Sequence, residues 1–515
     1  MVCALSACIQ SQFAVGLGIG AVGCYAVGMP LPTLTLDPTV ELPLYRQLGD
    51  ALAGAIAEGT LDEGERLPSE RDLAVSLGVS RTTVVTAYRE LESRGLVRGH
   101  VGRGTFVCAA EEPIDAPFAW RGRVALGAQR GLDPALRGVL NASGPGTISF
   151  GAGTPAPERF PVDLFRRLTD DVLRRDATTA FGIGPTEGQP GLRAAVAGRL
   201  GARPEQVLVV AGAQQGLDLI ARCLLDPGDA VLIDRPGYLG AIQTFRSAGA
   251  HLVGWDVERA DPDELEDLIL RYRPKLLYAT PTFQNPTGRT LSLEVRRELL
   301  RVAARYRLPI VEDDPYGLLW FDRPPPPSLF ALDERGLVIH LGTASKTLGA
   351  GLRLGWLVAP PAIVEQLTLV KARGDLFTSG LTQLVLAEIL ASRAYDAHLA
   401  SLRTEHAARH AALATALRRR LPAGALGWRP AEGGLYLWCR LRGGTDAVGL
   451  LQRAQAAGVT FVPGEPFYSD GLGRHELRLC FSAATPASID EGVRRLATAF
   501  AAGPNGLAAG HHALV

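Results

Sequence analysis

Residues 341–356 read Leu-Gly-Thr-Ala-Ser-Lys-Thr-Leu-Gly-Ala-Gly-Leu-Arg-Leu-Gly-Trp, and they directly follow an apolar, strand-like run. The stretch contains one lysine, Lys346, with hydroxyls at Thr343 and Ser345 before it and a guanidinium at Arg353 after it. A lysine amine can form a Schiff base with an aldehyde cofactor, and hydroxyls with a guanidinium can hold a phosphate. The stretch therefore predicts a site for pyridoxal 5'-phosphate.

Short apolar runs alternate with helical stretches on both sides of this lysine, from residue 147 to about 502. Runs of this length between helices are typical of buried, mostly parallel strands. The sequence thus predicts an α/β fold, with helices on both faces of the sheet. The expected strands are Val207–Val210, Val231–Ile233, Leu276–Ala279, Ile310–Val311 and Val338–Leu341.

Polar and aromatic residues follow the carboxyl ends of these strands, where open α/β sheets bind their ligands. The free N–H groups of Ala213 and Gln214, in a glycine turn that opens a helix, can take a phosphate. The Tyr238 ring can stack on a flat heterocycle. Later strand ends offer an amide, a carboxylate and a phenol, at Asn285, Asp313 and Tyr316.

A different pattern lies far upstream. Apolar residues at helical spacing predict a helix over 44–57. Ser69 begins a capping box that opens a second helix, and Gly78 ends that helix. Ser80 can cap a third helix, and residues 96–107 read as a β-hairpin. Two short helices joined by a glycine-containing turn predict a helix-turn-helix unit, here followed by a wing.

This unit predicts a surface that binds double-stranded DNA. The third helix would present Arg81, Thr82 and Thr83 to base edges or phosphates, and Arg103 lies at the hairpin tip. The alternative is a small helical module for protein interactions, because acidic residues outnumber basic ones over 37–108. Basic residues prevail in the second half of this region, however, as phosphate binding requires.

Both patterns resemble known families. Residues 43–107 resemble the GntR-type winged helix, which implies that Arg71, Arg81 and the wing at Gly104 contact DNA. Residues 147–502 resemble a fold-type I aminotransferase domain, of the branch with α-aminoadipate and kynurenine aminotransferases. The combination resembles the MocR/GabR class of transcriptional regulators.

The resemblance implies a role for each candidate residue of the larger region. Lys346 is the catalytic lysine that carries the cofactor, and Asp313 pairs with the pyridinium nitrogen. Asn285 and Tyr316 bond the phenolic oxygen of the ring, and Tyr238 stacks on its face. Arg478 grips the carboxylate of a substrate or effector with its bidentate fork. The residues that the resemblance places around the phosphate are Ala213, Gln214, Thr343, Ser345 and Arg353.

Two positions depart from the family pattern. Ile183 stands where a tyrosine commonly reaches the phosphate of the neighbouring subunit, and isoleucine cannot donate that hydrogen bond. Ala350 replaces a frequent proline, which is a minor change. The resemblance also implies a homodimer with the site at the subunit interface.

Two functions of different class follow. The first is a pyridoxal-phosphate-dependent transcriptional regulator that senses an amino compound, or in a variant of this reading the cofactor itself. The alternative is an active aminotransferase with an appended DNA-binding module, because Lys346, Asp313 and Arg478 are all present.

Composition sets further bounds. A length of 515 residues predicts at least two domains. The chain has 53 basic and 53 acidic residues, so its net charge predicts no class of partner. The seven cysteines are scattered, with no C-x-x-C pair, so neither a disulfide framework nor a metal site is predicted. A reducing, cytoplasmic setting fits best.

The expected organisation has five parts. Residues 1–36 are uncharged, and their longest apolar stretch is shorter than the roughly 20 residues that span a bilayer, so no membrane association is expected. We expect translation to begin at Met29, with a disordered or membrane-leaning extension as the alternative. The remaining parts are the winged helix over 37–108, a linker over 109–146, the cofactor domain over 147–502 and a flexible tail over 503–515.

Overall fold

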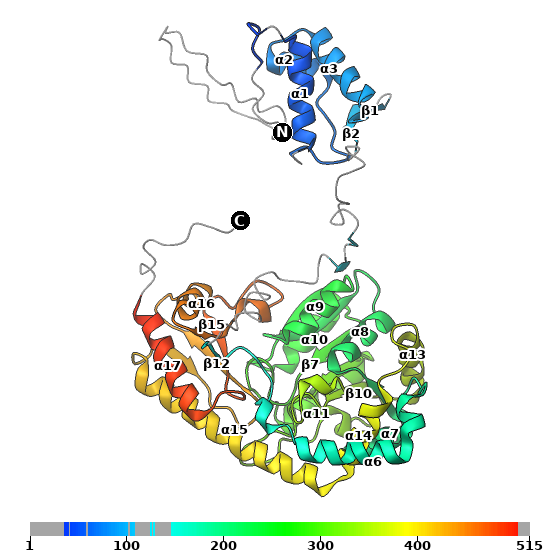
Figure 1. Cartoon of the computed structure of the whole chain (residues 1–515), viewed down its shortest axis with the longest axis vertical. Coiled ribbons are helices and arrows are strands. Elements are labelled where there is room, and N and C mark those ends of the chain that lie inside the picture. The colour runs from blue at the N-terminus through cyan, green and yellow to red at the C-terminus, as the bar shows by residue number, and fades with distance from the viewer. Residues whose placement is uncertain are drawn as a thin grey trace. The chain divides into compact units, whose positions relative to one another are not determined.

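The computed structural model describes residues 36–40, 42–57, 60–100, 104–108, 124–125, 127–128 and 146–502. These residues form two compact units, which divide between residues 123 and 124 (Figure 1). The expectations for the uncharged extension, most of the linker and the tail lie outside the described residues. Within the described part of the chain, no helix is long and apolar enough to cross a bilayer.

The first unit has three helices and a two-stranded hairpin, as the sequence predicts. Ser69 caps α2 by accepting a hydrogen bond from the Asp72 N–H at 3.2 Å, and Gly78 ends that helix in the left-handed region at a φ of 65°. Ser80 caps α3 in the same way. The elements are α1 (Leu44–Ala57), α2 (Glu70–Leu77), α3 (Arg81–Ser93), β1 (Val97–His100) and β2 (Gly104–Val107).

One apolar core holds these elements together. Leu48 and Leu52 of α1 pack with Val84 and Leu91 of α3, and all four side chains are fully buried. Burying a side chain of this size contributes about 1.5–3 kcal/mol. The opposite face of α3 therefore remains free for a ligand, with its first residues fixed by the Ser80 cap.

The second unit is built on a seven-stranded sheet of described residues, in the order β4-β10-β9-β8-β7-β5-β6. Strands β5 to β9 run parallel to one another, and β10 is antiparallel to both β4 and β9. The mostly parallel sheet is confirmed, but β6 and β10 were not predicted. The strands are β4 (Val207–Val210), β5 (Ala230–Arg235), β6 (His251–Asp256), β7 (Leu276–Ala279), β8 (Ile310–Asp313), β9 (Val338–Thr343) and β10 (Gly355–Val358).

Helices cover both faces of this sheet, as predicted. One face packs on α8 (Ala213–Leu224), α9 (Leu239–Ser247) and α13 (Pro361–Ala372). The other face packs on α6 (Val162–Phe181), α7 (Pro190–Leu200), α10 (Pro262–Tyr272), α11 (Leu293–Tyr306), α12 (Leu329–Leu332) and α14 (Gly380–Ala391). Alternate strand residues supply the two cores, as the side-chain period of a strand requires.

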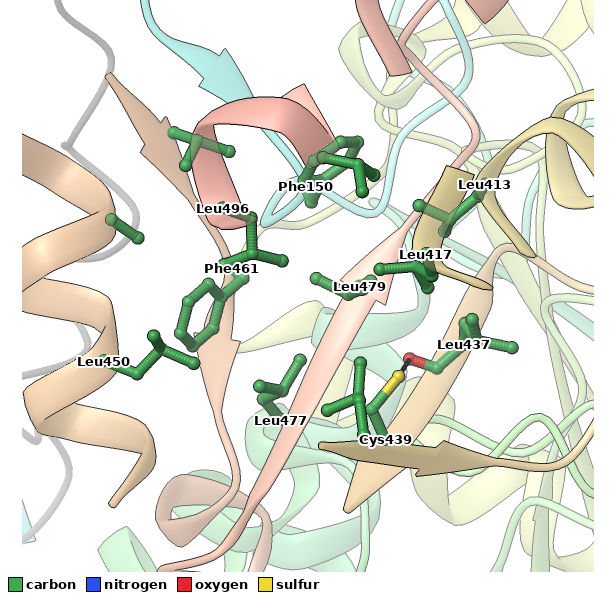
Figure 2. Packing of buried hydrophobic residues seen from close by; sticks show 14 of the residues in the cluster. Phe150, Leu413, Leu417, Leu437, Cys439, Leu450, Phe461, Leu477, Leu479 and Leu496 are labelled. Atoms are coloured by element: carbon green, nitrogen blue, oxygen red, sulfur yellow. Dashed lines mark hydrogen bonds between the residues drawn. The ribbon is translucent and has the colours of Figure 1, made fainter. Parts of the chain in front are cut away.

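A smaller antiparallel sheet follows, which the sequence reading did not predict. Its order is β11 (Leu426–Trp428), β12 (Tyr436–Leu441), β15 (Glu476–Cys480) and β14 (Val462–Pro463). It packs on α15 (Arg393–Arg420), α16 (Ala447–Ala456) and α17 (Pro486–Ala501), and α15 and α17 lie side by side (Figure 1). Figure 2 shows its core, in which Phe150, Leu413, Phe461 and Leu479 converge.

Residues 148–149 join the second unit in a separate two-stranded sheet beside the smaller sheet. β3 (Ile148–Ser149) pairs in parallel with β13 (Val459–Thr460), and Phe150 is buried in the core shown in Figure 2. The larger and smaller sheets therefore form two halves, called below the large half and the small half. The loops at the carboxyl ends of β5, β7, β8 and β9 open toward residues of the small half.

Candidate cofactor site

Residues of both halves line a cavity of about 380 Å3 at these strand ends. This volume is typical of a small-molecule site. Every residue that the sequence reading assigned to the cofactor or to a carboxylate lines it: Ala213, Gln214, Tyr238, Asn285, Asp313, Tyr316, Thr343, Ser345, Lys346, Arg353 and Arg478. The structure thus brings together residues that are far apart along the chain.

Lys346 lies in the turn that follows β9, with its side chain half-buried. Its ammonium donates a hydrogen bond to the Gly153 carbonyl at 2.6 Å. Glycine at position 153 allows this close approach, because a Cβ there would collide with the Tyr436 hydroxyl unless Tyr436 moved. The backbone of residues 151–154 therefore forms a wall against which the amine is held, and the sequence reading missed this wall.

Asp313, the last residue of β8, is buried and only partly satisfied. Its Oδ2 accepts a hydrogen bond from the Tyr278 hydroxyl at 2.6 Å, whereas no described residue donates to Oδ1. Burial raises the pKa of Asp313 to about 6, and the bond from Tyr278 opposes that rise. A buried oxygen without a donor is costly, so this site favours a ligand that brings an N–H group to Oδ1.

A second buried carboxylate, Asp234, fastens two ligand-bearing loops together. Its Oδ2 accepts a hydrogen bond from the Thr280 N–H at 2.8 Å, and Gln284 donates to the Pro236 carbonyl at 2.7 Å. Burial raises the pKa of Asp234 to about 7. These bonds set the loop that carries Tyr238 against the loop that carries Asn285.

Arg478 enters the cavity from β15 of the small half, and its orientation is fixed by several groups. Nη1 donates to Asn285 Oδ1 at 2.9 Å, and Nη2 donates to the Gly151 carbonyl at 2.6 Å. The guanidinium lies over the Tyr436 ring, 4.3 Å from its centroid. Its buried Nε has no partner among the described residues, which leaves a donor for an incoming acid.

Phenolic groups line the space between Asp313 and Arg478. The Tyr316 and Tyr436 hydroxyls are 3.1 Å apart, and the Asn285 amide donates to the Tyr316 hydroxyl at 3.4 Å. Tyr436 was not predicted, although the glycine pair just before it, Gly433 and Gly434, signals a close approach of the backbone. A Cβ at Gly433 would lie only 2.5 Å from the Phe283 ring.

The opposite end of the cavity offers donors for an anion. Gly212 precedes α8 with a φ of 87°, and the N–H groups of Ala213 and Gln214 belong to the first turn of that helix. Arg353 reaches this turn and donates to the Ala211 carbonyl at 2.9 Å. The N-terminus of a helix carries partial positive charge, so these groups together suit a phosphate.

These donors and acceptors fit pyridoxal 5'-phosphate. The unpartnered Asp313 Oδ1 suits a protonated ring nitrogen, the start of α8 suits the phosphate, and the Lys346 amine lies in the same cavity. The fold and the cavity therefore define a pyridoxal-phosphate protein of fold type I.

Comparisons with known proteins agree with this class. The chain matches the family Aminotransferase class I and II over residues 147–496, and the family of bacterial regulatory proteins, gntR family, over 44–107. The chain therefore belongs to the aminotransferase class I and II family, with a GntR-type winged helix before that domain, and its cofactor is pyridoxal phosphate.

Two relatives and one solved structure illustrate the match. A 2-aminoadipate transaminase of Thermus thermophilus is 40% identical over 389 residues, covering 74% of this chain and 98% of that protein. The probable rhizopine catabolism regulatory protein MocR of Rhizobium meliloti is 34% identical over 481 residues, covering 91% and 96%. The structure of LysN, the alpha-aminoadipate aminotransferase of Thermus thermophilus complexed with N-(5'-phosphopyridoxyl)-L-leucine, matches with a TM-score of 0.71 and 38% identity, covering 75% of this chain and 98% of that one.

The winged helix presents most of its predicted DNA residues at the surface. Arg71, Arg81 and Thr82 are exposed. Arg81 forms an ion pair with Glu70 at 2.9 Å, and the Thr83 hydroxyl lies 2.9 Å from that of Ser80 in the helix cap. Gly104 begins β2, and Arg103 lies outside the described residues.

Proposed function

We propose that this chain is a pyridoxal-phosphate-dependent, DNA-binding transcriptional regulator that senses an amino compound with a carboxylate group. One observation carries the proposal: a winged helix and a cavity with both an amine and a carboxylate grip occur in one chain. MocR of Rhizobium meliloti, which is named as a probable regulatory protein, aligns with 91% of this chain, and this supports the same function.

In this proposal each residue has a defined task. When bound, pyridoxal phosphate supplies an aldehyde carbon that links to amines and a ring that withdraws electrons. Asp313 Oδ1 accepts the hydrogen bond of the ring nitrogen and keeps a proton there. Ser345, Arg353 and the start of α8 hold the phosphate. The Thr343 hydroxyl orients Ser345, since it lies 3.0 Å from Ser345 Oγ and 3.2 Å from the Leu354 carbonyl.

The effector is held from both halves at once. Lys346 of the large half would lie beside the amine of the effector, and Arg478 of the small half would bind its carboxylate through Nε and the adjoining amino group. A ligand can shift a conformational equilibrium only by binding one state better than another. Contacts to both halves meet that condition, because they depend on how the halves are arranged.

The decisive experiment is a fluorescence-anisotropy titration of the full chain with DNA from its own upstream region. It is run without and with pyridoxal phosphate, and then with a panel of amino acids. We expect tight, salt-sensitive binding that the cofactor or one amino compound changes. Weak binding that is indifferent to sequence and to every addition would contradict the proposal.

A response to pyridoxal phosphate alone, with no further change from any amine, would identify the cofactor itself as the signal. This outcome would retain DNA binding but assign Arg478 no part in sensing.

An active aminotransferase is the second candidate, and the complete set of Lys346, Asp313 and Arg478 in one cavity favours it. Transamination needs Lys346 to act again as a base after the amine has replaced it. Steady-state production of a keto acid by the wild-type protein, lost in Lys346→Ala, would establish turnover. The absence of product under conditions in which an amino acid changes DNA binding would favour sensing alone.

We also propose that the chain forms a homodimer in the cytoplasm, with two DNA readers for repeated half-sites. Two large apolar side chains support the dimer, because both are exposed in the single chain. Phe181, the last residue of α6, is 73% exposed, and Ile183, two residues further on, is 93% exposed. Sedimentation of the double variant Phe181→Asp, Ile183→Asp should show more monomer than the wild type.

Ile183→Tyr should restore a phosphate donor and tighten cofactor binding a few-fold, as one added hydrogen bond does.

A further inference from the structure

A network of polar groups lies behind the phosphate end of the cavity. Lys371, in the last turn of α13, is fully buried, and its ammonium pairs with Asp375 Oδ1 at 3.0 Å. Gln215 of α8 donates a hydrogen bond from Nε2 to Asp375 Oδ2 at 2.7 Å. The Gln215 Oε1 in turn accepts a hydrogen bond from the Ala211 N–H at 2.6 Å. Segments that are far apart in the sequence are therefore joined by these four residues, which we call the Gln215 network.

The donors and acceptors of the Gln215 network fit together in one direction only. The Ala211 N–H can only donate, and an ionised carboxylate at Asp375 can only accept. The Gln215 amide lies between them, so its oxygen must face Ala211 and its nitrogen must face Asp375. The Lys371 ammonium supplies the donor for the second carboxylate oxygen. Each member of the network therefore sets the orientation of the next.

The Gln215 network ends at the turn that is proposed to hold the phosphate of the cofactor. Ala211 precedes Gly212 and the first turn of α8, and the Ala211 carbonyl accepts a hydrogen bond from Arg353 Nη2 at 2.9 Å. A Cβ at Gly212 would lie 3.1 Å from the same nitrogen, so the guanidinium lies directly against this turn. The residue that Gln215 fixes through its N–H thus orients Arg353 through its carbonyl.

The side chains of the network lie outside the cavity. Lys371, Asp375 and Gln215 are not among the residues that line it, so they can act on a bound ligand only through Ala211 and its neighbours. A buried ammonium is costly unless it is paired, and a buried ion pair adds little stability beyond that of apolar residues of the same shape. Stability alone therefore does not account for the pair of Lys371 and Asp375, whereas the orientation of the Gln215 amide requires it.

We propose that Lys371, Asp375 and Gln215 are positioning residues for the phosphate of the cofactor. They hold Ala211 in the orientation at which the N–H groups at the start of α8 and the Arg353 guanidinium converge on one anion. The inference rests on the proposed function, in which this turn holds the phosphate, and it adds the residues that set the geometry of the turn. Because the network ends there, its effect should be confined to ligands that carry a phosphate.

The test compares pyridoxal 5'-phosphate with pyridoxal, which lacks the phosphate, in absorbance titrations of the full chain freed of cofactor. Gln215→Met keeps the length of the side chain and removes its hydrogen bonds. We expect this variant to bind pyridoxal 5'-phosphate roughly tenfold more weakly, which corresponds to about one lost hydrogen bond, and to bind pyridoxal as the wild type does. Gln366→Met is the matched control at an exposed position of α13, and it should change neither affinity.

Charge variants test the direction of the network. In the wild-type background, Asp375→Asn leaves one oxygen for two donors, so binding of pyridoxal 5'-phosphate should weaken. In a Gln215→Glu background the same change should strengthen binding, because the new amide at position 375 can donate to the new carboxylate at position 215 and still accept from Lys371. Asp218→Asn, at an exposed position of the same helix as Gln215, should have the same small effect in both backgrounds. A change of the same sign from Asp375→Asn in both backgrounds would contradict the network.

The outcomes separate this inference from the proposed function. Circular dichroism first identifies the variants that fold, and Gln215→Met decides alone if the charge variants do not. If Gln215→Met weakens both ligands equally, or weakens neither, the network serves only the stability of the fold and the inference fails. If the wild type binds pyridoxal 5'-phosphate no better than pyridoxal, the phosphate site of the proposed function itself fails.

Discussion

The winged helix and the cofactor cavity solve the problem of holding functional side chains in opposite ways. In the winged helix, Arg71, Arg81 and Thr82 are exposed and lie close together in sequence, and α2 and α3 are fixed by their caps and by the core behind them. In the cavity, the residues come from both halves, and Asp313, Asn285 and Arg478 are buried and hydrogen-bonded to other residues. Substitutions should accordingly cause graded, salt-dependent losses in the first region and large, specific losses in the second.

The largest effect is expected from Lys346→Ala. Without this amine the protein cannot hold pyridoxal phosphate covalently, so borohydride reduction should add no cofactor mass to the chain, as measured by mass spectrometry. Lys275→Ala, which removes a surface lysine near Asp229, should still be labelled fully. Covalent labelling of the Lys346 variant at another lysine would contradict the central role of this position.

Arg478→Lys should weaken binding of the amino-acid effector roughly 10- to 100-fold, because a lysine cannot reproduce a paired hydrogen bond to a carboxylate. The measurement is the effector titration of the bound cofactor's absorbance. Arg440→Lys is the control on the neighbouring strand, since its guanidinium is exposed and pairs with Glu476 at 2.9 Å. Equal effects of the two substitutions would remove the special status of the buried position.

Tyr278→Phe should reduce the affinity for pyridoxal phosphate about tenfold, since a hydrogen bond to a charged group contributes roughly 1.5–3 kcal/mol. The bond from Tyr278 lowers the pKa of Asp313, so its loss should raise that pKa above about 6. The affinity should therefore fall more at pH 6 than at pH 8, where Asp313 remains ionised. Tyr306→Phe, which removes an outer hydroxyl bonded to Glu266, should change neither the affinity nor its pH dependence.

Asp234→Asn should have the smallest effect, confined to the pH dependence of stability. The pKa of Asp234 in the folded protein is about 7, above its usual value near 4, so the folded state holds the proton more tightly. The free energy of unfolding of the protein without cofactor should fall from about pH 4 to about pH 7, by at most about 1.4 kcal/mol per pH unit from this group.

Replacement by asparagine should flatten that slope in chemical unfolding experiments, whereas Asp218→Asn, on the surface beside Arg222, should leave it unchanged. An unaltered slope in the Asp234 variant would assign the proton uptake to another group.

The sequence predicted those features that depend on residues close together along the chain. Ser69, Gly78 and Ser80 mark helix ends through their own backbone and side-chain chemistry, so the helices of the winged helix were predictable. The parallel strands were predictable because each is a short apolar run, and ligand residues follow their carboxyl ends. Every predicted cofactor residue lines the cavity for that reason, although their individual roles stay predictions.

The features that were missed depend on partners distant in sequence. Tyr278 reads as an ordinary apolar strand residue, and only the fold places its hydroxyl on Asp313. Tyr436 and the smaller sheet lack a strand pattern bounded by helices.

The pairing of β3 with β13 has a consequence for the residues that line the cavity. The Phe150 carbonyl accepts a hydrogen bond from the Cys480 N–H at 2.8 Å, and Cys480 is the last residue of the strand that carries Arg478. Residues 148–150 are therefore anchored to the same half that contains Arg478, the residue proposed to bind a carboxylate. A movement of that half would therefore displace Arg478 together with the backbone of residues 150–153, including the Gly153 carbonyl that binds the Lys346 amine.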